Sequence, residues 1–195
     1  EYAYHISCTL DDDDPTMKNP TVIHKINQYK NTSIAWGTSK SKIDAVNRDL
    51  PGIGWDILVV FSDDMVFTCY GFDEMIRQEM NQHFPDTDGY LHFPEKDSMS
   101  ALCVLTIMGR KYYHRFGYVY HPSYKSLFCD NEQMEVAKML NKYIYVYYIV
   151  FDHRNPAYHE YQEQKDEMFL EQQKIGWTID QENYNFRKSI NFEIG

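Results

Sequence analysis

Residues 56–65 read DILVVFSDDM, and this stretch decides the expected fold. Residues 56–61 predict a continuous apolar strand, of the type that is buried on both faces of a parallel sheet. The strand ends in Ser62, Asp63 and Asp64. Two adjacent carboxylates repel each other unless a cation or hydrogen-bond donors compensate them. Because ligands of open α/β sheets bind outside the carboxyl ends of the strands, the stretch predicts a hard divalent cation at this end of a sheet.

The stretch lies within an alternation of strands and helices. Strands are predicted where β-branched and aromatic residues cluster, over residues 2–10, 32–36, 56–61, 101–108 and 143–151. Helices are predicted where apolar residues recur every three or four positions, over residues 20–29, 39–50, 72–80, 130–140 and 162–173. Residues 87–94 have loop chemistry with a short strand, and the tail beyond Trp177 is expected to be helical. This order predicts a mostly parallel sheet with right-handed crossovers and a C-terminal helical extension.

Length and composition exclude several classes of protein. The chain has 195 residues, of which 43% are hydrophobic and 25% are charged, as expected of one globular domain. Its net charge of −10 argues against nonspecific binding to nucleic acid. Every apolar run, including residues 57–61, is far shorter than the roughly 18 residues that a membrane span needs. The four cysteines lack metal-binding spacing, so we expect reduced thiols in a cytoplasmic protein with no integral membrane segment.

A second acidic group follows the first predicted strand. Asp11–Asp14 stand at the end of residues 2–10, as Asp63 and Asp64 stand at the end of residues 56–61. If these two strands are neighbours in one sheet, both acidic groups open onto the same cleft. The alternative is a solvated turn in which one aspartate caps the next helix.

Two longer segments resemble a known family. Residues 41–48 (SKIDAVNR), followed by DILVVFSDDM, resemble the nucleotide-sugar half of family 2 glycosyltransferases with the GT-A fold, where a similar helix precedes a strand that ends in an acidic motif. Residues 108–138 (MGRKYYHRFGYVYHPSYKSLFCDNEQMEVAK) are similar to the acceptor half, where a glycine-containing bend and an aromatic stretch lead to an acidic motif at a helix start. Phe61 holds the first acidic place of the family's motif. The family's usual first strand is expected before Glu1, which fits a fragment.

The resemblance covers most of residues 5–155 and implies a three-layer αβα fold of the GT-A type. Within this single domain, residues 1–100 would form the nucleotide-sugar half and residues 101–155 the acceptor half. Residues 156–195 would form C-terminal helices.

The resemblance implies a role for several residues on the donor side. Residues expected to contact the nucleotide are Asp11, Asp12, Lys42 and Asn47. Asp63, with Asp64 beside it, would bind Mn²⁺ or Mg²⁺ on the diphosphate of the donor. A late histidine completes the metal site in many enzymes with this fold, which makes His153 a candidate, although a packed histidine is the alternative. Arg154 is an alternative clamp for the diphosphate.

On the acceptor side, Asp130 matches the last acid of the family's motif and would be the general base. Glu132 is the alternative base, and an N-cap role for Asp130 with Gln133 three residues later fits the same stretch. Gly109 and Arg110 either shape the acceptor cleft or form a plain strand-to-helix turn.

The sequence therefore predicts a metal-dependent inverting glycosyltransferase. It would move a sugar from a nucleoside-diphosphate sugar to a hydroxyl of a glycan or another acceptor. A nucleotidyltransferase is one alternative, although no glycine-rich basic loop is visible, and a non-catalytic nucleotide- or carbohydrate-binding module is another.

Overall fold

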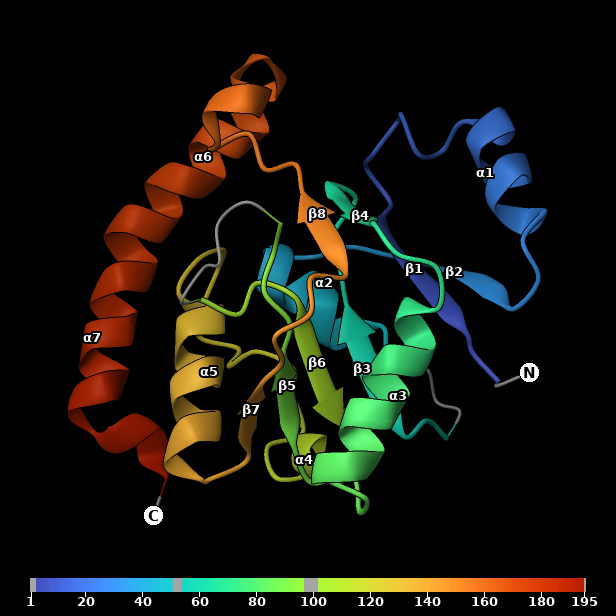
Figure 1. Ribbon diagram of the computed structural model, residues 1–195. Coiled ribbons are helices and arrows are strands. Elements are labelled where there is room, and N and C mark those ends of the chain that lie inside the picture. Colours follow the sequence, from blue (N-terminus) through green and yellow to red (C-terminus); the bar gives the residue numbers. More distant parts are fainter. Residues whose placement is uncertain (1–2, 51–53, 97–101, 195) are drawn as a thin grey trace. The chain divides into compact units, whose positions relative to one another are not determined.

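The computed structural model describes residues 3–50, 54–96 and 102–194 (Figure 1). Contacts group the chain into two compact units, residues 1–54 and residues 55–195. The expected single domain with boundaries at residues 100 and 155 stays a prediction. In the described ranges, every helix is too short or too polar to span a bilayer.

The first unit is built on a strand–helix–strand crossover, as the sequence predicts. β1 (Ile6–Asp11) and β2 (Thr32–Gly37) pair in parallel. Between them, α1 (Pro20–Asn27) begins with proline in its first turn, where the missing N–H costs nothing. The Asn19 side chain caps α1 by accepting a hydrogen bond from Thr21 N at 2.9 Å.

The second helix of this unit, α2 (Lys42–Arg48), begins three residues after the predicted start at residue 39. Ser41 Oγ accepts a hydrogen bond from Asp44 N at 3.1 Å. The Asp44 carboxylate accepts in return from Lys40 N at 2.9 Å, one residue earlier than in a standard capping box. Two backbone N–H groups at the start of α2 are thereby satisfied, which explains why the helix begins here and not at Ser39.

The second unit contains a mixed sheet. Its strand order is β3 (Ile57–Val60), β6 (Thr106–Gly109), β5 (Tyr90–His92) and β7 (Tyr143–Tyr145). β6 runs antiparallel to both of its neighbours, whereas β5 and β7 are parallel. The prediction of a mostly parallel sheet is therefore wrong for this unit, and the chain as a whole is mixed α/β.

Two predictions about β3 also fail. Its four residues are half-buried, and in the described part of the chain β3 pairs only with β6, so it is not a doubly buried parallel strand. The expected pairing of β3 with the first strand does not occur among the described residues, because β1 pairs with β2. A run of apolar residues indicates that a strand is at least partly buried, but it carries no information about the direction of its partner.

The predicted strand over residues 143–151 is divided in two. β7 ends at Tyr145, and the chain then leaves the sheet and enters β8 (Phe151–His153). β8 pairs antiparallel with β4 (Met65–Phe67), a strand that the sequence analysis does not predict. The partner changes within five residues, since Val146 N donates to His92 O at 2.8 Å while Val150 O accepts from Thr68 N at 2.9 Å.

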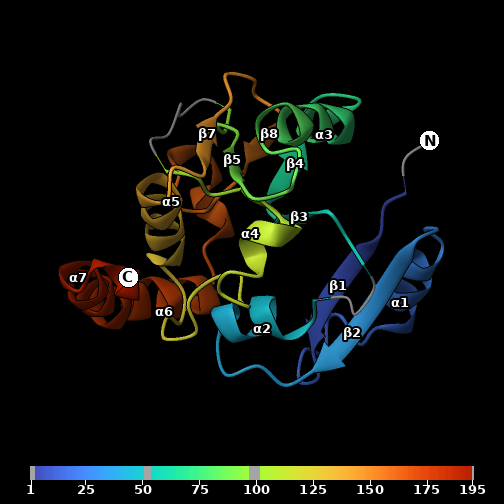
Figure 2. The ribbon, with the colours of Figure 1, turned by 90° about the horizontal axis from the view of Figure 1, so that it is seen from below.

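Helices lie on both sides of the strands of the second unit. α3 (Phe72–His83) buries Ile76 and Met80 against Leu91, Ile107 and Phe151. α5 (Cys129–Met139) lies on the opposite side of the strands from α3 in both views (Figures 1 and 2). The short α4 (Arg110–Tyr113) follows β6 directly.

The C-terminal extension is helical, as predicted, and its elements run from His159 to Glu193, within the expected residues 156–195. It comprises η1 (His159–Gln164), α6 (Glu167–Ile175), the π-helical η2 (Gly176–Asp180), α7 (Gln181–Ser189) and η3 (Asn191–Glu193). α7 lies beyond α5 on the side away from α3 (Figure 2). The four cysteines are free thiols, in agreement with the sequence analysis.

One buried carboxylate joins three segments of the second unit. Asp88, in the connection between α3 and β5, is 2% exposed. Arg115 Nε donates to Asp88 Oδ1 at 2.8 Å, and Lys142 Nζ lies 2.9 Å from Asp88 Oδ2. The hydrogen bonds from Arg115, opposed by burial and supported by Lys142, lower the pKa of Asp88 to about 2.

We therefore expect the second unit to lose stability in acid. The contribution of Asp88 is fully present above the ordinary pKa of an aspartate, about 3.9, and disappears as the pH falls toward 2. Asp88→Asn should remove about 2 kcal/mol of unfolding free energy at pH 7 and flatten its dependence on pH between about 4 and 2. Urea unfolding across this range measures both effects. The hydrogen bond from Lys111 also lowers the pKa of Asp86, but this carboxylate is exposed. Asp86→Asn is therefore the control and should change the profile much less than Asp88→Asn.

Candidate functional site

The pairing of β4 with β8 brings together the two sequence stretches that carry the predicted metal ligands. Met65 stands opposite His153 in this pair, and Arg154 N donates to Asp64 O at 2.8 Å. Asp64 and His153 therefore lie side by side beyond the carboxyl end of β3. We call Asp64, His153, Glu95 and Tyr158 the His153 cluster.

The imidazole of the His153 cluster lies between two carboxylates. His153 Nε2 is 3.2 Å from Asp64 Oδ2, and His153 Nδ1 is 3.2 Å from Glu95 Oε2. Tyr158 OH donates to the other oxygen of Glu95 at 2.8 Å. His153 is 9% exposed and Glu95 only 2%, so the ring is held in a largely dry environment.

This environment determines the protonation of the ring. Burial lowers the pKa of His153, but the hydrogen bonds to Asp64 and Glu95 raise it by more than burial lowers it. The resulting pKa is about 9. Both ring nitrogens then carry a proton, and the imidazolium partly neutralises the two carboxylates. His153 Nε2 can bind a cation only when that proton is released. Burial and the hydrogen bond to Glu95 also raise the pKa of Tyr158, which keeps its hydroxyl protonated and donating.

Once the Nε2 proton is released, the donor atoms of the cluster would suit a divalent cation that is completed by a ligand. Cis ligands of an octahedral Mg²⁺ lie about 3 Å apart, close to the 3.2 Å between Asp64 Oδ2 and His153 Nε2. Within the described ranges, no three His, Cys, Asp or Glu side chains are grouped so that they could hold a metal ion alone. Mg²⁺ commonly uses one or two protein ligands together with water and substrate phosphates, and Glu95 would orient the imidazole from its other nitrogen.

Asp63 and Asp64 lie on the same turn but have different surroundings. Asp63, the acid that the resemblance makes the principal ligand, is exposed. Asp64 is half-buried, accepts a hydrogen bond from the Ser62 hydroxyl and contacts His153. The geometry therefore favours Asp64 as the acid that shares a cation with His153.

The predicted general bases are two residues apart on α5 and differ in their surroundings. Asp130 is half-buried in the first turn, and its Oδ1 accepts from Asn131 N at 2.9 Å. The residue at the N-cap is Phe128, so the capping role considered for Asp130 is wrong. Glu132 is buried, and both of its oxygens are engaged by Arg187, at 2.8 and 2.9 Å.

Topology places Asp130 at the same end of the second unit as the His153 cluster. β3, β5 and β7 run in one direction, because β6 is antiparallel to β3 and β5 while β7 is parallel to β5. α5 leads into β7 through a short connection, so its first turn lies toward the carboxyl ends of these strands. Figure 1 shows the start of α5 at the end of the sheet where β4 and β8 lie.

Gly109 and Arg110 lie at the opposite end. Gly109 ends β6 and stands opposite Ile57, the first residue of β3. Asp64 lies beyond Val60, the last residue of β3. A Cβ on Gly109 would lie 2.1 Å from Thr87 O, so only glycine allows this close approach. Arg110 begins α4, and its backbone N donates to Asp56 O at 2.8 Å. The structure thus places both residues in a strand-to-helix turn and does not bring them to the His153 cluster.

Arg154 is next to the cluster but points elsewhere. Its side chain is half exposed, and its Nε lies 3.5 Å from an oxygen of Asp152. The weak contact leaves the guanidinium accessible to a ligand, as a diphosphate clamp requires.

In the first unit, Asp11 belongs to a polar cluster at the carboxyl ends of β1 and β2. Ser39 Oγ donates to Asp11 Oδ1 at 2.5 Å, and Arg48 Nη1 donates to Ser39 Oγ at 2.7 Å. Arg48 also pairs with Asp49 at 2.6 Å, which raises the pKa of the guanidinium. A Cβ on Gly37 would lie 2.8 Å from Arg48 Cζ, so glycine at the end of β2 makes room for this arginine.

The other candidates of the first unit are less constrained. Asp12 is exposed and lies 3.5 Å from Lys18 Nζ. Lys42 is exposed in the first turn of α2, and Asn47 is half-buried near its end.

Sequence reasoning missed Glu95, Tyr158 and Arg48. Glu95 is a single acid in a stretch with loop chemistry, and it reaches His153 because it forms a parallel bridge with Phe151. No spacing in the sequence signals such a contact. Arg48 lies within the stretch SKIDAVNR, but only the folded crossover brings it to Asp11.

Comparison of the chain with models of protein families, with curated proteins and with solved structures gives no match.

The Glu132–Arg187 pair yields a stability prediction. Arg187→Met leaves the buried Glu132 without its cation and should lower the unfolding free energy by about 3–5 kcal/mol. The double variant Arg187→Met/Glu132→Met should recover much of this loss, because two apolar side chains of similar length replace the pair. Lys188 lies on the same helix as Arg187 and forms an exposed pair with Glu135 of α5. Lys188→Met breaks this pair, is the control and should have a small effect. Urea unfolding measures all three variants, and equal losses for Arg187→Met and Lys188→Met would contradict the prediction.

Proposed function

We propose that this chain is a metal-dependent inverting glycosyltransferase with a GT-A-like three-layer architecture. It would transfer a sugar from a nucleoside-diphosphate sugar to an acceptor hydroxyl. The observation that carries the proposal is the contact between Asp64 and His153 at the carboxyl end of β3. A carboxylate and an imidazole at cis-ligand spacing suit Mn²⁺ or Mg²⁺ on a diphosphate.

The net charge of the chain supports a role for a cation. At −10, the protein repels a diphosphate unless a local positive charge compensates it. Asp64 and His153 would hold the ion, Glu95 would orient the imidazole, and the accessible Arg154 would add a second positive charge. When bound, the ion would neutralise the charge that develops on the leaving diphosphate.

Asp130 is the proposed general base. As the acceptor oxygen attacks the anomeric carbon, the bond to the diphosphate breaks on the opposite face, and Asp130 takes the hydroxyl proton. This single displacement inverts the configuration at the anomeric carbon. Both Glu132 oxygens are engaged by Arg187, which argues against Glu132 as the base. The start of α5 lies at the end of the sheet where β4 and β8 lie, which supports a base on that turn (Figure 1).

The first unit would bind the nucleotide. The Asp11 carboxylate at the carboxyl end of β1 would accept hydrogen bonds from the base or the ribose. Ser39 and Arg48 hold this carboxylate in place. Lys42 and Asn47 would line the nucleotide from α2, and the exposed Asp12 would add a polar contact.

Mn²⁺-dependent donor binding tests the cation site. Asp64→Asn should abolish Mn²⁺-dependent binding of a nucleoside-diphosphate sugar in calorimetry against a panel of such donors, and Asp63→Asn should weaken it less. The reason is that Asn keeps the shape of Asp64 but removes the charge that faces His153. Asp86→Asn is the control for loss of one surface acid. Unchanged binding by Asp64→Asn would contradict the assignment. Release of pyrophosphate from a nucleoside triphosphate in the presence of a sugar 1-phosphate would favour a nucleotidyltransferase.

The base assignment separates an enzyme from a binding module. Asp130→Asn should fold and bind the donor normally, while its transfer rate falls by roughly 10²–10⁴-fold, the usual effect of removing a positioned base. Steady-state transfer to acceptor, with the donor KM measured in parallel, gives both quantities. Near-full transfer by Asp130→Asn would refute the role.

A further inference from the structure

The C-terminal helices contact one segment of the second unit repeatedly. This segment is the loop of residues 123–128 together with α5, which begins at Cys129. Asn183 Nδ2 donates to Ser123 Oγ at 2.8 Å at the start of the loop. At the other end, Arg187 binds Glu132 within α5. The segment that carries Asp130 is therefore held on both sides of that residue.

Asp180 makes the central contact. It is 0% exposed, and its carboxylate accepts hydrogen bonds from three consecutive backbone N–H groups of the loop. The donors are Lys125 N at 2.9 Å, Ser126 N at 2.7 Å and Leu127 N at 2.8 Å. An ionised carboxylate is the strongest acceptor that a side chain can offer to backbone amides, so the contact fixes the path of the loop.

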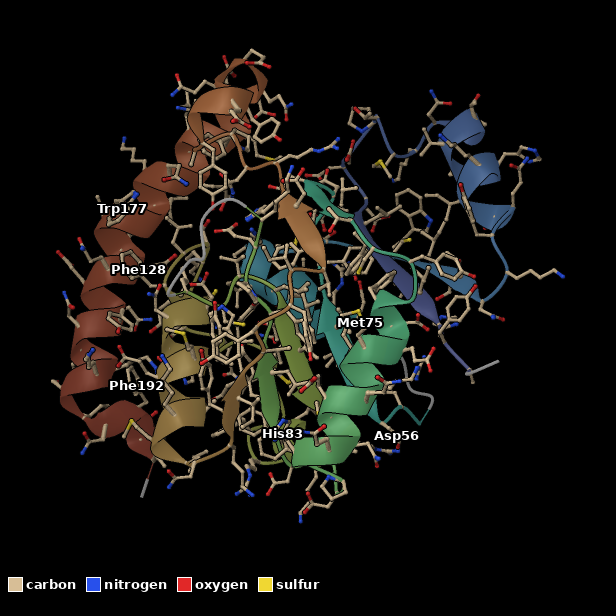
Figure 3. The ribbon with its side chains drawn as sticks, in the orientation of Figure 1. Asp56, Met75, His83, Phe128, Trp177 and Phe192 are labelled. Atoms are coloured by element: carbon tan, nitrogen blue, oxygen red, sulfur yellow. The ribbon has the colours of Figure 1, made fainter. Side chains whose placement is uncertain are left out.

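The loop ends in a backbone conformation that needs external support. Phe128 has φ 62° and ψ −8°, the left-handed region that a bulky residue rarely adopts. Its ring lies 5.3 Å from that of Trp177 at 89° and 5.6 Å from that of Tyr184. Figure 3 shows Phe128 and Trp177 close together, from the start of α5 and from the C-terminal helices. Asp130 follows two residues later, in the first turn of the helix for which Phe128 is the N-cap.

We propose that Asp180 is a positioning residue for the transfer reaction: through residues 125–127 and Phe128 it sets the place of Asp130 relative to the acceptor. The inference rests on the proposed function, because it requires Asp130 to be the base. It makes the C-terminal extension part of the catalytic apparatus and not an appendage. A displacement of about 1 Å in a reacting group costs as much as 10²-fold in rate, so a small shift of this turn is enough.

The test combines Asp180→Asn with Asp130→Asn in a double-mutant cycle. Asp180→Asn keeps the shape of the side chain and weakens its hold on the three N–H groups. It should lower kcat by roughly 10- to 10²-fold while the donor KM and the Mn²⁺ affinity stay within about twofold, since neither depends on this loop. In the Asp130→Asn background, the same substitution should change the residual rate by less than about twofold, because the group it positions is already absent.

Glu182→Gln is the matched control. Glu182 is an exposed acid two residues further along the same helices, and its substitution should leave kcat unchanged. Hydrogen exchange by the amides of residues 125–127 should be faster in Asp180→Asn and normal in Glu182→Gln, which shows whether the loop was released. All rates are measured well below the melting temperature of each variant.

Each result decides the question. A released loop with unchanged kcat, or an unreleased loop, overturns the positioning role. A fall in kcat of equal size with and without the Asp130 carboxylate also overturns it, because Asp180 then supports the fold and does not act through the base. In both cases the proposed function stands. A wild-type chain that transfers no sugar from any donor overturns the proposed function, and this inference with it.

Discussion

The backbone pairing of β4 with β8 is the constraint on which the candidate site depends. It joins a turn that follows β3 to a segment near the end of the main sheet, and its register puts Met65 opposite His153. Because side chains alternate between the two faces of a strand, a slip of one residue would turn His153 away from Asp64 and Glu95. The change of partner between Val146 and Val150 therefore matters for chemistry as much as for the fold.

Much of the local structure follows from the sequence, because caps and apolar spacing act within a few residues. α1 starts at the expected residue behind the Asn19 cap, and α2 starts three residues later than expected, behind Ser41. The helix predicted over residues 130–140 is observed one residue earlier. The pairing of strands does not follow. Residues 143–151 are continuously β-prone, and only tertiary contacts to His92 and Thr68 decide that the run is divided.

The same limit applies to the candidate site. The acidic turn and His153 are visible in the sequence, because a strand end in an α/β protein is where a ligand is expected. The sequence does not decide between Asp63 and Asp64, because adjacent residues on a turn point in different directions. Only the contact with His153 distinguishes the two acids. The sequence does not indicate a role for Glu95, because a single acid in a loop is seen to be buried and paired with His153 only in the folded structure.

Asp130 and Glu132 show how one helix separates stability from chemistry. Successive helical residues are about 100° apart, so two residues two positions apart point about 200° apart, to nearly opposite sides. Glu132 faces α7, where Arg187 compensates its burial, and a carboxylate used in this way cannot also take a proton from a substrate. Asp130 lies away from that ion pair, near the buried Cys103 and Tyr120, whose pKa values its charge helps to raise. The ion pair that anchors the C-terminal helices thus occupies the rival carboxylate, so the two acids of this motif have different surroundings.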